Sequence, residues 1–307
     1  MAQRRSLARG CGVGVAAAGV VASALGVAGP AQAAQPAPKV GATSAYLLDA
    51  ESGKKLWGQG DSSAREMAST TKVMTATVAV DTAGALDKTV TVKQEYRDYV
   101  QREGASQADL KTGDKLTVRQ LLPAMLLPSG CDAAYAIADK LGSGDTVQER
   151  VSSFIGKMNT KADELGLQNT EFDSFDGISQ GGDNKTTAGD LAKLTRHAME
   201  NSTFAATVKK TTAEEEATNG RQYTWYNTNK LLGSYAGAVG VKTGTGTAAG
   251  PCLVFAAERD GRTVIGVVLN STSGDARYTD AKNMLDYAYG SESTLKLRTL
   301  PKGAEQD

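Results

Sequence analysis

The chain has 307 residues and carries 34 basic and 34 acidic side chains, which give it a formal net charge of zero. This balance excludes the strongly basic surface by which many proteins bind nucleic acids. Its single histidine, His197, limits the catalytic classes, because a Ser-His-Asp triad or a zinc peptidase would have to use it. The polar helix face predicted around it favours a surface histidine, and we expect neither a metal nor a cofactor.

The first 33 residues have the pattern of a secretory signal peptide. Three arginines precede a small-residue apolar run, 13–27, which ends in the Ala-Gln-Ala sequence at 31–33, a pattern typical of a cleavage site. A membrane anchor is the alternative, but the run is short for a span of about 20 strongly apolar residues. We therefore predict a secreted, cell-wall-associated protein without a stable membrane anchor, whose formal charge after cleavage is −3 because the segment holds three arginines and no acid.

The first third of the remaining chain predicts strands and then a helix. Two short apolar runs, 44–49 and 55–58, are separated by turn residues and predict a β-hairpin. From 67 to 83, apolar residues recur at helical spacing with little charge, which predicts a buried helix. Around Val90 and Leu116 we expect short extended pieces joined by loops.

The middle of the chain is predicted to be helical. A helix beginning at Thr117 ends at Pro128, because proline disfavours helical dihedrals in the residue before it. Three further helices are predicted over 129–141, 147–165 and 188–200. A glycine-rich loop, 176–182, separates the last two of them.

The last third returns to strands, predicted over 239–245, 253–257 and 264–269, before a final helix over 277–289. Two strands at the start and three at the end predict a five-stranded antiparallel sheet flanked by helices, with an inserted all-helical lobe, an α/β (α+β) fold. We expect one catalytic domain, 34–307, with the active site where the lobes meet and no C-terminal β domain. Its sheet lobe would span about 40–90 and 205–290, and its helical lobe about 91–204.

The first candidate for chemistry is the pair Ser69 and Lys72. They are three residues apart at the start of the predicted buried helix, so one turn brings hydroxyl and amine onto the same face. Free N–H groups at a helix start favour the negative charge of a developing oxyanion. Burial disfavours a charged amine, so Lys72 could accept the proton of Ser69. The pattern alone is common, and Ser69 as a helix cap is the simpler interpretation.

Two further motifs follow along the chain. Ser129-Gly130-Cys131, directly after Pro128, supplies a second hydroxyl that could relay protons or cap the next helix. The predicted strand Lys242-Thr243-Gly244-Thr245 offers a cation, hydroxyls and close backbone approach to an anionic substrate. Because strand alternation points Lys242 and Thr243 to opposite faces, both serve one site only at the sheet border. An edge strand protected by a lysine is the alternative.

Two cysteines, Cys131 and Cys252, remain after the predicted cleavage. In an oxidising compartment they could form a disulfide, but both also suit the role of small apolar core residues. The sequence leaves these alternatives open.

The three motifs, in this order and spacing, resemble the Ser-x-x-Lys, Ser-x-Asn and Lys-Thr-Gly signature of penicillin-binding proteins and class A β-lactamases. The chain is similar to a low-molecular-mass D-alanyl-D-alanine carboxypeptidase or transpeptidase over roughly residues 40–290. The similarity extends to segments flanking the motifs, at 116–122, 158–167, 229–232 and 280–287.

The resemblance implies a role for each motif residue. Ser69 would be the nucleophile, Lys72 its base and Ser129 the proton relay. Lys242 and Thr243 would bind the terminal carboxylate of the substrate.

The substrate implied by the resemblance is a peptidoglycan stem peptide ending in D-Ala-D-Ala. The N–H groups of Ser69 and Thr245 would form the oxyanion hole, and β-lactams would acylate Ser69 as substrate mimics. The chain departs from the family at Cys131, where an asparagine is usual, so one amide contact in the substrate site is lost. We hypothesise that this replacement favours transfer to an amine acceptor over hydrolysis, or slows turnover.

Two other functions stay open at this stage. A class A β-lactamase needs a deacylating glutamate, for which Glu164 and Glu171 are poor candidates because no Glu-x-x-Leu-Asn sequence surrounds them. A non-catalytic peptidoglycan or β-lactam sensor would keep the fold without turnover, against which the complete set of motif residues argues.

Overall fold

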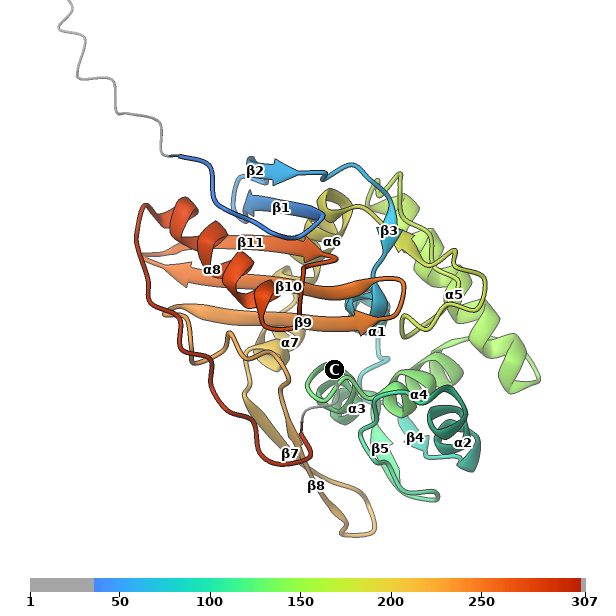
Figure 1. Cartoon of the computed structure of the whole chain (residues 1–307). Helices are drawn as coiled ribbons and strands as arrows, with labels where there is room; N and C mark the ends of the chain where they lie inside the picture. Colours follow the sequence, from blue (N-terminus) through green and yellow to red (C-terminus); the bar gives the residue numbers. More distant parts are fainter. Residues whose placement is uncertain (1–35, 305–307) are drawn as a thin grey trace, which may run out of the picture. The chain divides into compact units, whose positions relative to one another are not determined.

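A five-stranded antiparallel sheet is assembled from both ends of the described chain, residues 36–304 of the computed structural model (Figure 1). Its strands are β1 Ser44–Asp49, β2 Lys55–Gln59, β9 Ala238–Gly246, β10 Gly250–Arg259 and β11 Arg262–Leu269. They lie in the order β2-β1-β11-β10-β9, and every neighbouring pair is antiparallel. The predicted sheet of two early and three late strands is confirmed, whereas the predicted signal peptide lies outside the described residues.

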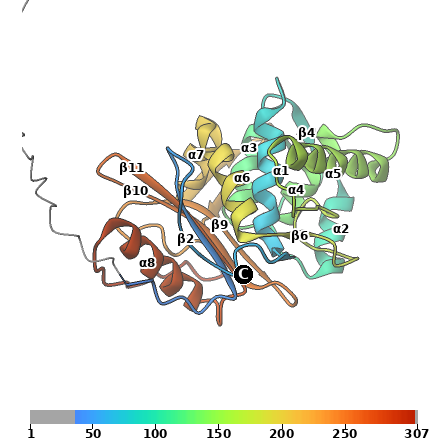
Figure 2. The ribbon, with the colours of Figure 1, turned by 90° about the horizontal axis from the view of Figure 1, so that it is seen from above.

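Helices cover both faces of this sheet (Figure 2). The helix α8, Ala276–Tyr289, packs against β10 and β11 on one face, and α6, Ala188–Glu200, packs against β1 and β11 on the other. Central strands buried on two sides need apolar residues at nearly every position, as β10 and β11 have. Gly266 fits this packing because a Cβ there would lie 2.1 Å from the ring of Phe255.

The remaining helices form the part of the chain that faces β9. A short 3-10 helix, η1 Ala68–Thr71, leads into α1, Lys72–Asp81, so the helix predicted over 67–83 is split at the site. The helices that follow are α2 Gln94–Glu103, α3 Val118–Leu126, α4 Cys131–Leu141 and α5 Val147–Glu164. Capping boxes at Thr117 and Thr146 explain why α3 and α5 begin at their first residues.

The helix α2 was not predicted, because its apolar signal is too short. Only Tyr96 and Val100, one turn apart, are buried, and the other side chains of the helix are largely polar. The segment between the predicted extended pieces at Val90 and Leu116 is therefore helical over 94–103, and the predicted loop is limited to 104–114. The two pieces themselves are confirmed as β4 Thr89–Thr91 and β5 Lys115–Thr117, which pair with each other.

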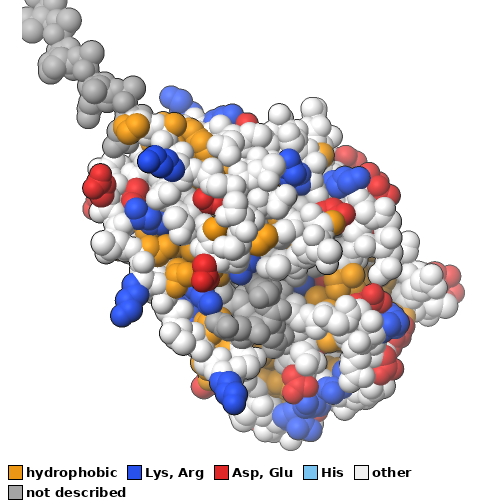
Figure 3. All heavy atoms as spheres, viewed as in Figure 1, with side chains coloured by type: hydrophobic (Ala, Val, Ile, Leu, Met, Phe, Trp, Pro, Cys, Tyr) orange, Lys and Arg blue, Asp and Glu red, His pale blue; other side chains and the backbone are white. Residues whose placement is uncertain are grey.

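Several smaller elements complete the fold without a sequence prediction. They are β3 Arg65–Glu66 paired with β6 Lys185–Thr186, the helix α7 Ser202–Val208, and the hairpin of β7 Thr212–Glu216 and β8 Gln222–Tyr226. Within residues 36–304, no helix combines the length and apolarity needed to span a membrane. On the face in Figure 3, basic and acidic side chains are interspersed and do not form one basic surface.

Candidate active site

Ser69 lies in the tight turn of η1, where it is partly accessible while Ala68 and Thr70 are buried. Ala68 has a φ of +46°, a left-handed conformation that is uncommon for a residue with a side chain. No side chain caps η1 or α1, so Ser69 is not the helix cap that the simpler interpretation assumed. Its hydroxyl instead accepts a hydrogen bond from Lys72 Nζ at 2.8 Å.

Lys72 connects three parts of the site although it begins a buried helix. Its side chain is fully buried, and its amine also donates to the backbone oxygen of Asp176 at 2.9 Å. A longer contact of 3.5 Å joins the amine to Ser129 Oγ. A buried amine is tolerated only when its N–H groups are satisfied, and here the partners include both predicted hydroxyls. The structure therefore brings the first two motifs together around one amine.

Ser129 sits in the short connection between α3 and α4, in a left-handed conformation with a φ of +68°. The hydroxyl of Ser106 donates to the Ser129 oxygen at 2.9 Å, and the Cys131 amide donates back to the Ser106 oxygen at the same distance. Gly130 has no room for a side chain, since a Cβ would lie 2.6 Å from the Ala124 oxygen. The connection is thus held in one conformation that points Ser129 toward Lys72.

The two described cysteines are both free and buried, which rules out the disulfide alternative in this structure. Burial raises the pKa of the Cys131 thiol to about 12, with Lys72 lowering it and Asp176 raising it. The thiol therefore stays protonated at neutral pH. Burial likewise raises the pKa of Cys252, on β10, to about 11.

The third motif occupies β9, the sheet-edge strand that packs against η1. Lys242 is in register with Val254, and Thr243 with Leu253, and these partners belong to core clusters on opposite faces. Strand alternation therefore holds as predicted. Both motif side chains are nevertheless buried, and η1 and residues 202–208 pack against this strand. At this edge, the Thr243 hydroxyl lies 2.7 Å from the Thr228 hydroxyl.

Gly244 allows β9 to approach the nucleophile. A Cβ at this position would lie 3.0 Å from the Thr70 nitrogen and 3.1 Å from the Ser69 nitrogen. The next residue, Thr245, is exposed at the end of the strand, and its hydroxyl accepts from Arg277 at 3.0 Å. The backbone of β9 at Gly244 therefore lies close to the amides of η1.

Three residues at the site escaped the sequence analysis. Arg277, on α8, donates to the oxygen of Gly244 at 3.2 Å as well as to Thr245. Asp176 is buried and accepts from Tyr99, whose hydroxyl lies 2.8 Å from its carboxylate. The glycine-rich loop gave a weak signal for Asp176, whereas Tyr99 lies in the unpredicted α2 and carried none.

The candidates with other predicted roles lie elsewhere. His197 Nε2 contacts Asp81 at 2.8 Å, and Asp81 is nine residues, about 13 Å of helix, beyond Lys72. The prediction of a surface histidine agrees with this partly exposed pair. Glu164 pairs with Lys161 at 2.8 Å with over half its side chain exposed, and Glu171 is also exposed.

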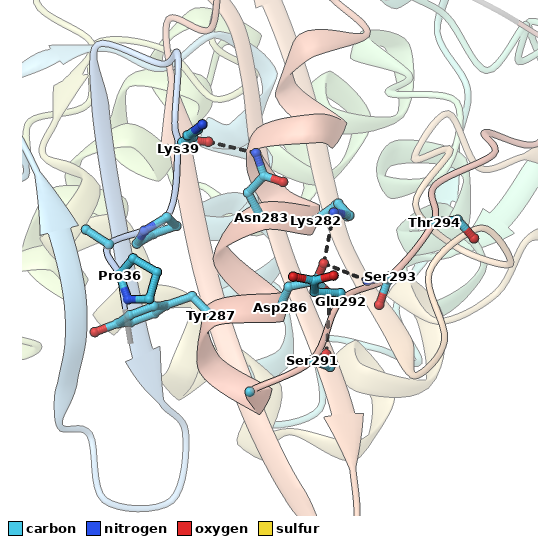
Figure 4. A pocket seen from close by; sticks show the side chains of 13 residues that line it. Pro36, Lys39, Lys282, Asn283, Asp286, Tyr287, Ser291, Glu292, Ser293 and Thr294 are labelled. Atoms are coloured by element: carbon cyan, nitrogen blue, oxygen red, sulfur yellow. Dashed lines mark hydrogen bonds and ion pairs between the residues drawn. The ribbon is translucent and has the colours of Figure 1, made fainter. Parts of the chain in front are cut away.

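A separate surface pocket of about 720 Å³ runs along α8 and is lined by none of the motif residues (Figure 4). Residues 36–39 and 290–294 form its other walls. Within it, Asp286 accepts from Lys282 at 3.0 Å and from the Ser293 amide at 2.9 Å. These bonds hold the turn after the helix, so Asp286 has structural partners in this pocket.

Comparison with known proteins adds independent findings. A model of the D-alanyl-D-alanine carboxypeptidase family matches residues 31–273. The D-alanyl-D-alanine carboxypeptidase of Streptomyces sp. (strain K15) is 50% identical over 258 residues, which cover 82% of this chain and 88% of that protein.

Solved structures agree with the sequence comparison. A crystal structure of the Streptomyces K15 DD-transpeptidase, 50% identical, matches with a TM-score of 0.81 over 83% of this chain and 100% of that one. A crystal structure of a D-alanyl-D-alanine carboxypeptidase from Mycobacterium tuberculosis, 30% identical, matches with a TM-score of 0.75 over 87% of this chain and 98% of that one.

Proposed function

The chain belongs to the D-alanyl-D-alanine carboxypeptidase family, and from this premise we propose that Ser69 carries the acyl group when a D-Ala-D-Ala peptide is cleaved. The protein is a serine-type DD-carboxypeptidase or transpeptidase. The observation that carries the proposal is the 2.8 Å contact between Ser69 Oγ and the amine of Lys72, which is fully buried.

The proposed reaction begins with attack of Ser69 Oγ on the carbonyl carbon of the penultimate D-Ala. Lys72 takes the hydroxyl proton, and the N–H groups of Ser69 and Thr245 stabilise the oxyanion. Ser129, which shares the Lys72 amine with Ser69, passes a proton to the nitrogen of the departing D-Ala and takes one back from the protonated amine, which becomes neutral again. An ester on Ser69 remains, and attack by water or by an amine acceptor releases the acyl group and restores the hydroxyl.

Substrate binding follows from the charge on β9. Lys242 supplies a cation and Thr243 a hydroxyl at the strand edge next to η1, and together they would bind the terminal carboxylate of a peptidoglycan stem peptide. A penicillin presents a carboxylate and a strained amide in a similar arrangement, so it would acylate Ser69 and block it.

The balance between hydrolysis and transfer would depend on Cys131. Its protonated, buried thiol offers weaker hydrogen bonds than the amide usual at this position. The similar Streptomyces K15 protein is named a DD-transpeptidase in its crystal structure. Both facts support transfer to an amine as part of the activity.

The location of the substrate supports export. Peptidoglycan lies outside the cytoplasmic membrane, and the pattern of residues 1–33 would direct the chain there. In this proposal residues 34–307 form the catalytic domain and act at the cell wall.

Labelling with a fluorescent penicillin, followed by measurement of D-Ala release from a stem-peptide analogue, tests the function. We expect stable labelling and D-Ala release, and both should disappear in Ser69→Ala but persist in Ser63→Ala, which alters an exposed serine outside the site. Rapid release of hydrolysed penicillin would indicate a β-lactamase, and labelling without D-Ala release a sensor. Survival of either signal in Ser69→Ala would refute the assignment.

A further inference from the structure

A carboxylate without a role in the proposed reaction lies inside the site. Asp176 is fully buried, and its two oxygens accept from the Tyr99 hydroxyl at 2.8 Å and from the Ile178 amide at 3.0 Å. Burying a charged group costs several kcal/mol unless it is paired and hydrogen-bonded. A buried carboxylate at this point therefore needs an explanation beyond the stability of a loop.

The segment that carries Asp176 contacts both the base and the nucleophile turn. The Asp176 oxygen accepts from Lys72 Nζ at 2.9 Å, and the preceding oxygen, of Phe175, accepts from Thr75 at 2.5 Å. Gly177 lies so close to the turn that a Cβ would be 2.0 Å from the Ala68 oxygen. A shift of this segment would thus move the partner of the amine and the backbone next to Ser69.

The hydroxyl of Tyr99, on α2, is a side-chain donor to this carboxylate. Burial and then the charge of Asp176 raise the pKa of Tyr99 strongly, so the phenol stays protonated and donates. The same carboxylate helps to raise the pKa of the Cys131 thiol, so its charge acts on the second motif as well. Tyr99 on α2, Asp176 in the loop and Lys72 on α1 are therefore linked by consecutive hydrogen bonds.

We propose that Tyr99 and Asp176 are positioning residues for acylation: Tyr99 fixes the Asp176 carboxylate, and the anchored segment holds the Lys72 amine toward Ser69. The inference rests on the proposed function of Ser69 and Lys72. Neither residue touches the substrate in this scheme. Both act through the Lys72 amine, which takes the proton of Ser69.

The test compares Tyr99→Phe with Tyr135→Phe by stopped-flow measurement of fluorescent penicillin acylation. Tyr135 is a matched control because its ring packs 5.2 Å from that of Tyr99, while its hydroxyl bonds the exposed Glu95. We expect Tyr99→Phe to lower the acylation rate constant about tenfold to 100-fold, the kinetic equivalent of losing a hydrogen bond to a charged group. The dissociation constant of the complex before acylation should stay within about twofold, as should both parameters in Tyr135→Phe.

A double-mutant cycle shows whether Tyr99 acts through the carboxylate. In an Asp176→Ala background, Tyr99→Phe should lower the acylation rate by less than about twofold, because its partner is already absent. Asp176→Asn, which keeps an acceptor for Tyr99 and the size of the side chain, should retain more activity than Asp176→Ala. Thermal unfolding of each variant identifies any loss that comes from misfolding, and the comparison of Tyr99→Phe with Tyr135→Phe carries the test if the alanine variant does not fold.

The outcomes separate this inference from the function on which it rests. If the unaltered protein is not labelled at Ser69, the proposed function fails. If it is labelled and Tyr99→Phe acylates as fast as Tyr135→Phe, only the positioning role is wrong. Equal effects of Tyr99→Phe in the unaltered protein and in the Asp176→Ala background would overturn it too.

Discussion

The close approach of β9 to the nucleophile turn can be tested by adding a single methyl group to Gly244. Its Cβ would lie 3.0 Å from the Thr70 nitrogen and 3.1 Å from both the Met67 oxygen and the Ser69 nitrogen. These neighbours are backbone atoms, which cannot rotate away as a side chain can. Gly244→Ala must therefore push the turn and the strand apart by a few tenths of an ångström.

The structure sets the expected size of this effect. Because Gly244 does not have a positive φ, the alanine adds a steric clash without backbone strain. Inserting a methyl group into a close-packed contact typically costs about 1–3 kcal/mol of stability. Misplacing reacting groups by about 1 Å can cost 100-fold in rate, so we expect acylation by penicillin to slow about tenfold or more.

Gly246→Ala is the matched control, on the same strand and two residues further on. Its Cβ would meet only the Cβ atoms of Ala68 at 3.4 Å and Ala249 at 3.7 Å, which are ordinary contacts. Stopped-flow acylation and thermal unfolding of both variants provide the measurement. If Gly244→Ala acylates as fast as Gly246→Ala while folding normally, the close approach has no part in catalysis and the reasoning is wrong.

Three further predictions concern side-chain chemistry. Cys131→Asn should raise the ratio of hydrolysis to transfer, measured as free acid against amine adduct from one acyl donor, and an unchanged ratio would refute the role given to the thiol. The native Cys131 thiol should resist iodoacetamide at pH 8, because it is buried and its pKa is raised to about 12. It should react after the protein is unfolded in urea. Rapid labelling of Cys131 in the native protein would contradict its burial. The Ser52 amide and Arg262 lower the pKa of Asp49 to about 2, so stability from ionised Asp49, about 1 kcal/mol after solvent screening, is present above about pH 4 and lost as the pH falls through about 2. Urea unfolding between pH 6 and 2 should show a larger loss of stability in the unaltered protein than in Asp49→Asn, and equal losses would refute the role of Asp49.

Much of the fold was accessible from local patterns in the sequence. The sheet strands and the longer helices carry apolar periodicities that extend over several turns or alternations, and these were predicted within a few residues. The helix α2 was missed because burial of only Tyr96 and Val100 leaves too little periodicity to recognise. The hairpin of β7 and β8 was missed as well, since its charged first strand is not typical of a buried one.

Ser69, Lys72, Ser129 and the Lys242-Thr243 pair could be named from the sequence because their types and order match a motif set. That order says which residues meet but not how. The 2.8 Å contact of Ser69 with Lys72 follows from one turn of chain, whereas the contact of Lys72 with Ser129 joins residues 57 positions apart.

The sequence by itself thus determined the motif residues and the elements that carry them, because both depend on neighbours within one or two turns of the chain. Only the tertiary structure decided that Tyr99 and Asp176 meet across 77 residues, and that two buried cysteines stay apart as free thiols. The physical reason is that such contacts depend on how helices and sheet pack against each other. No local periodicity records which side chains that packing brings together.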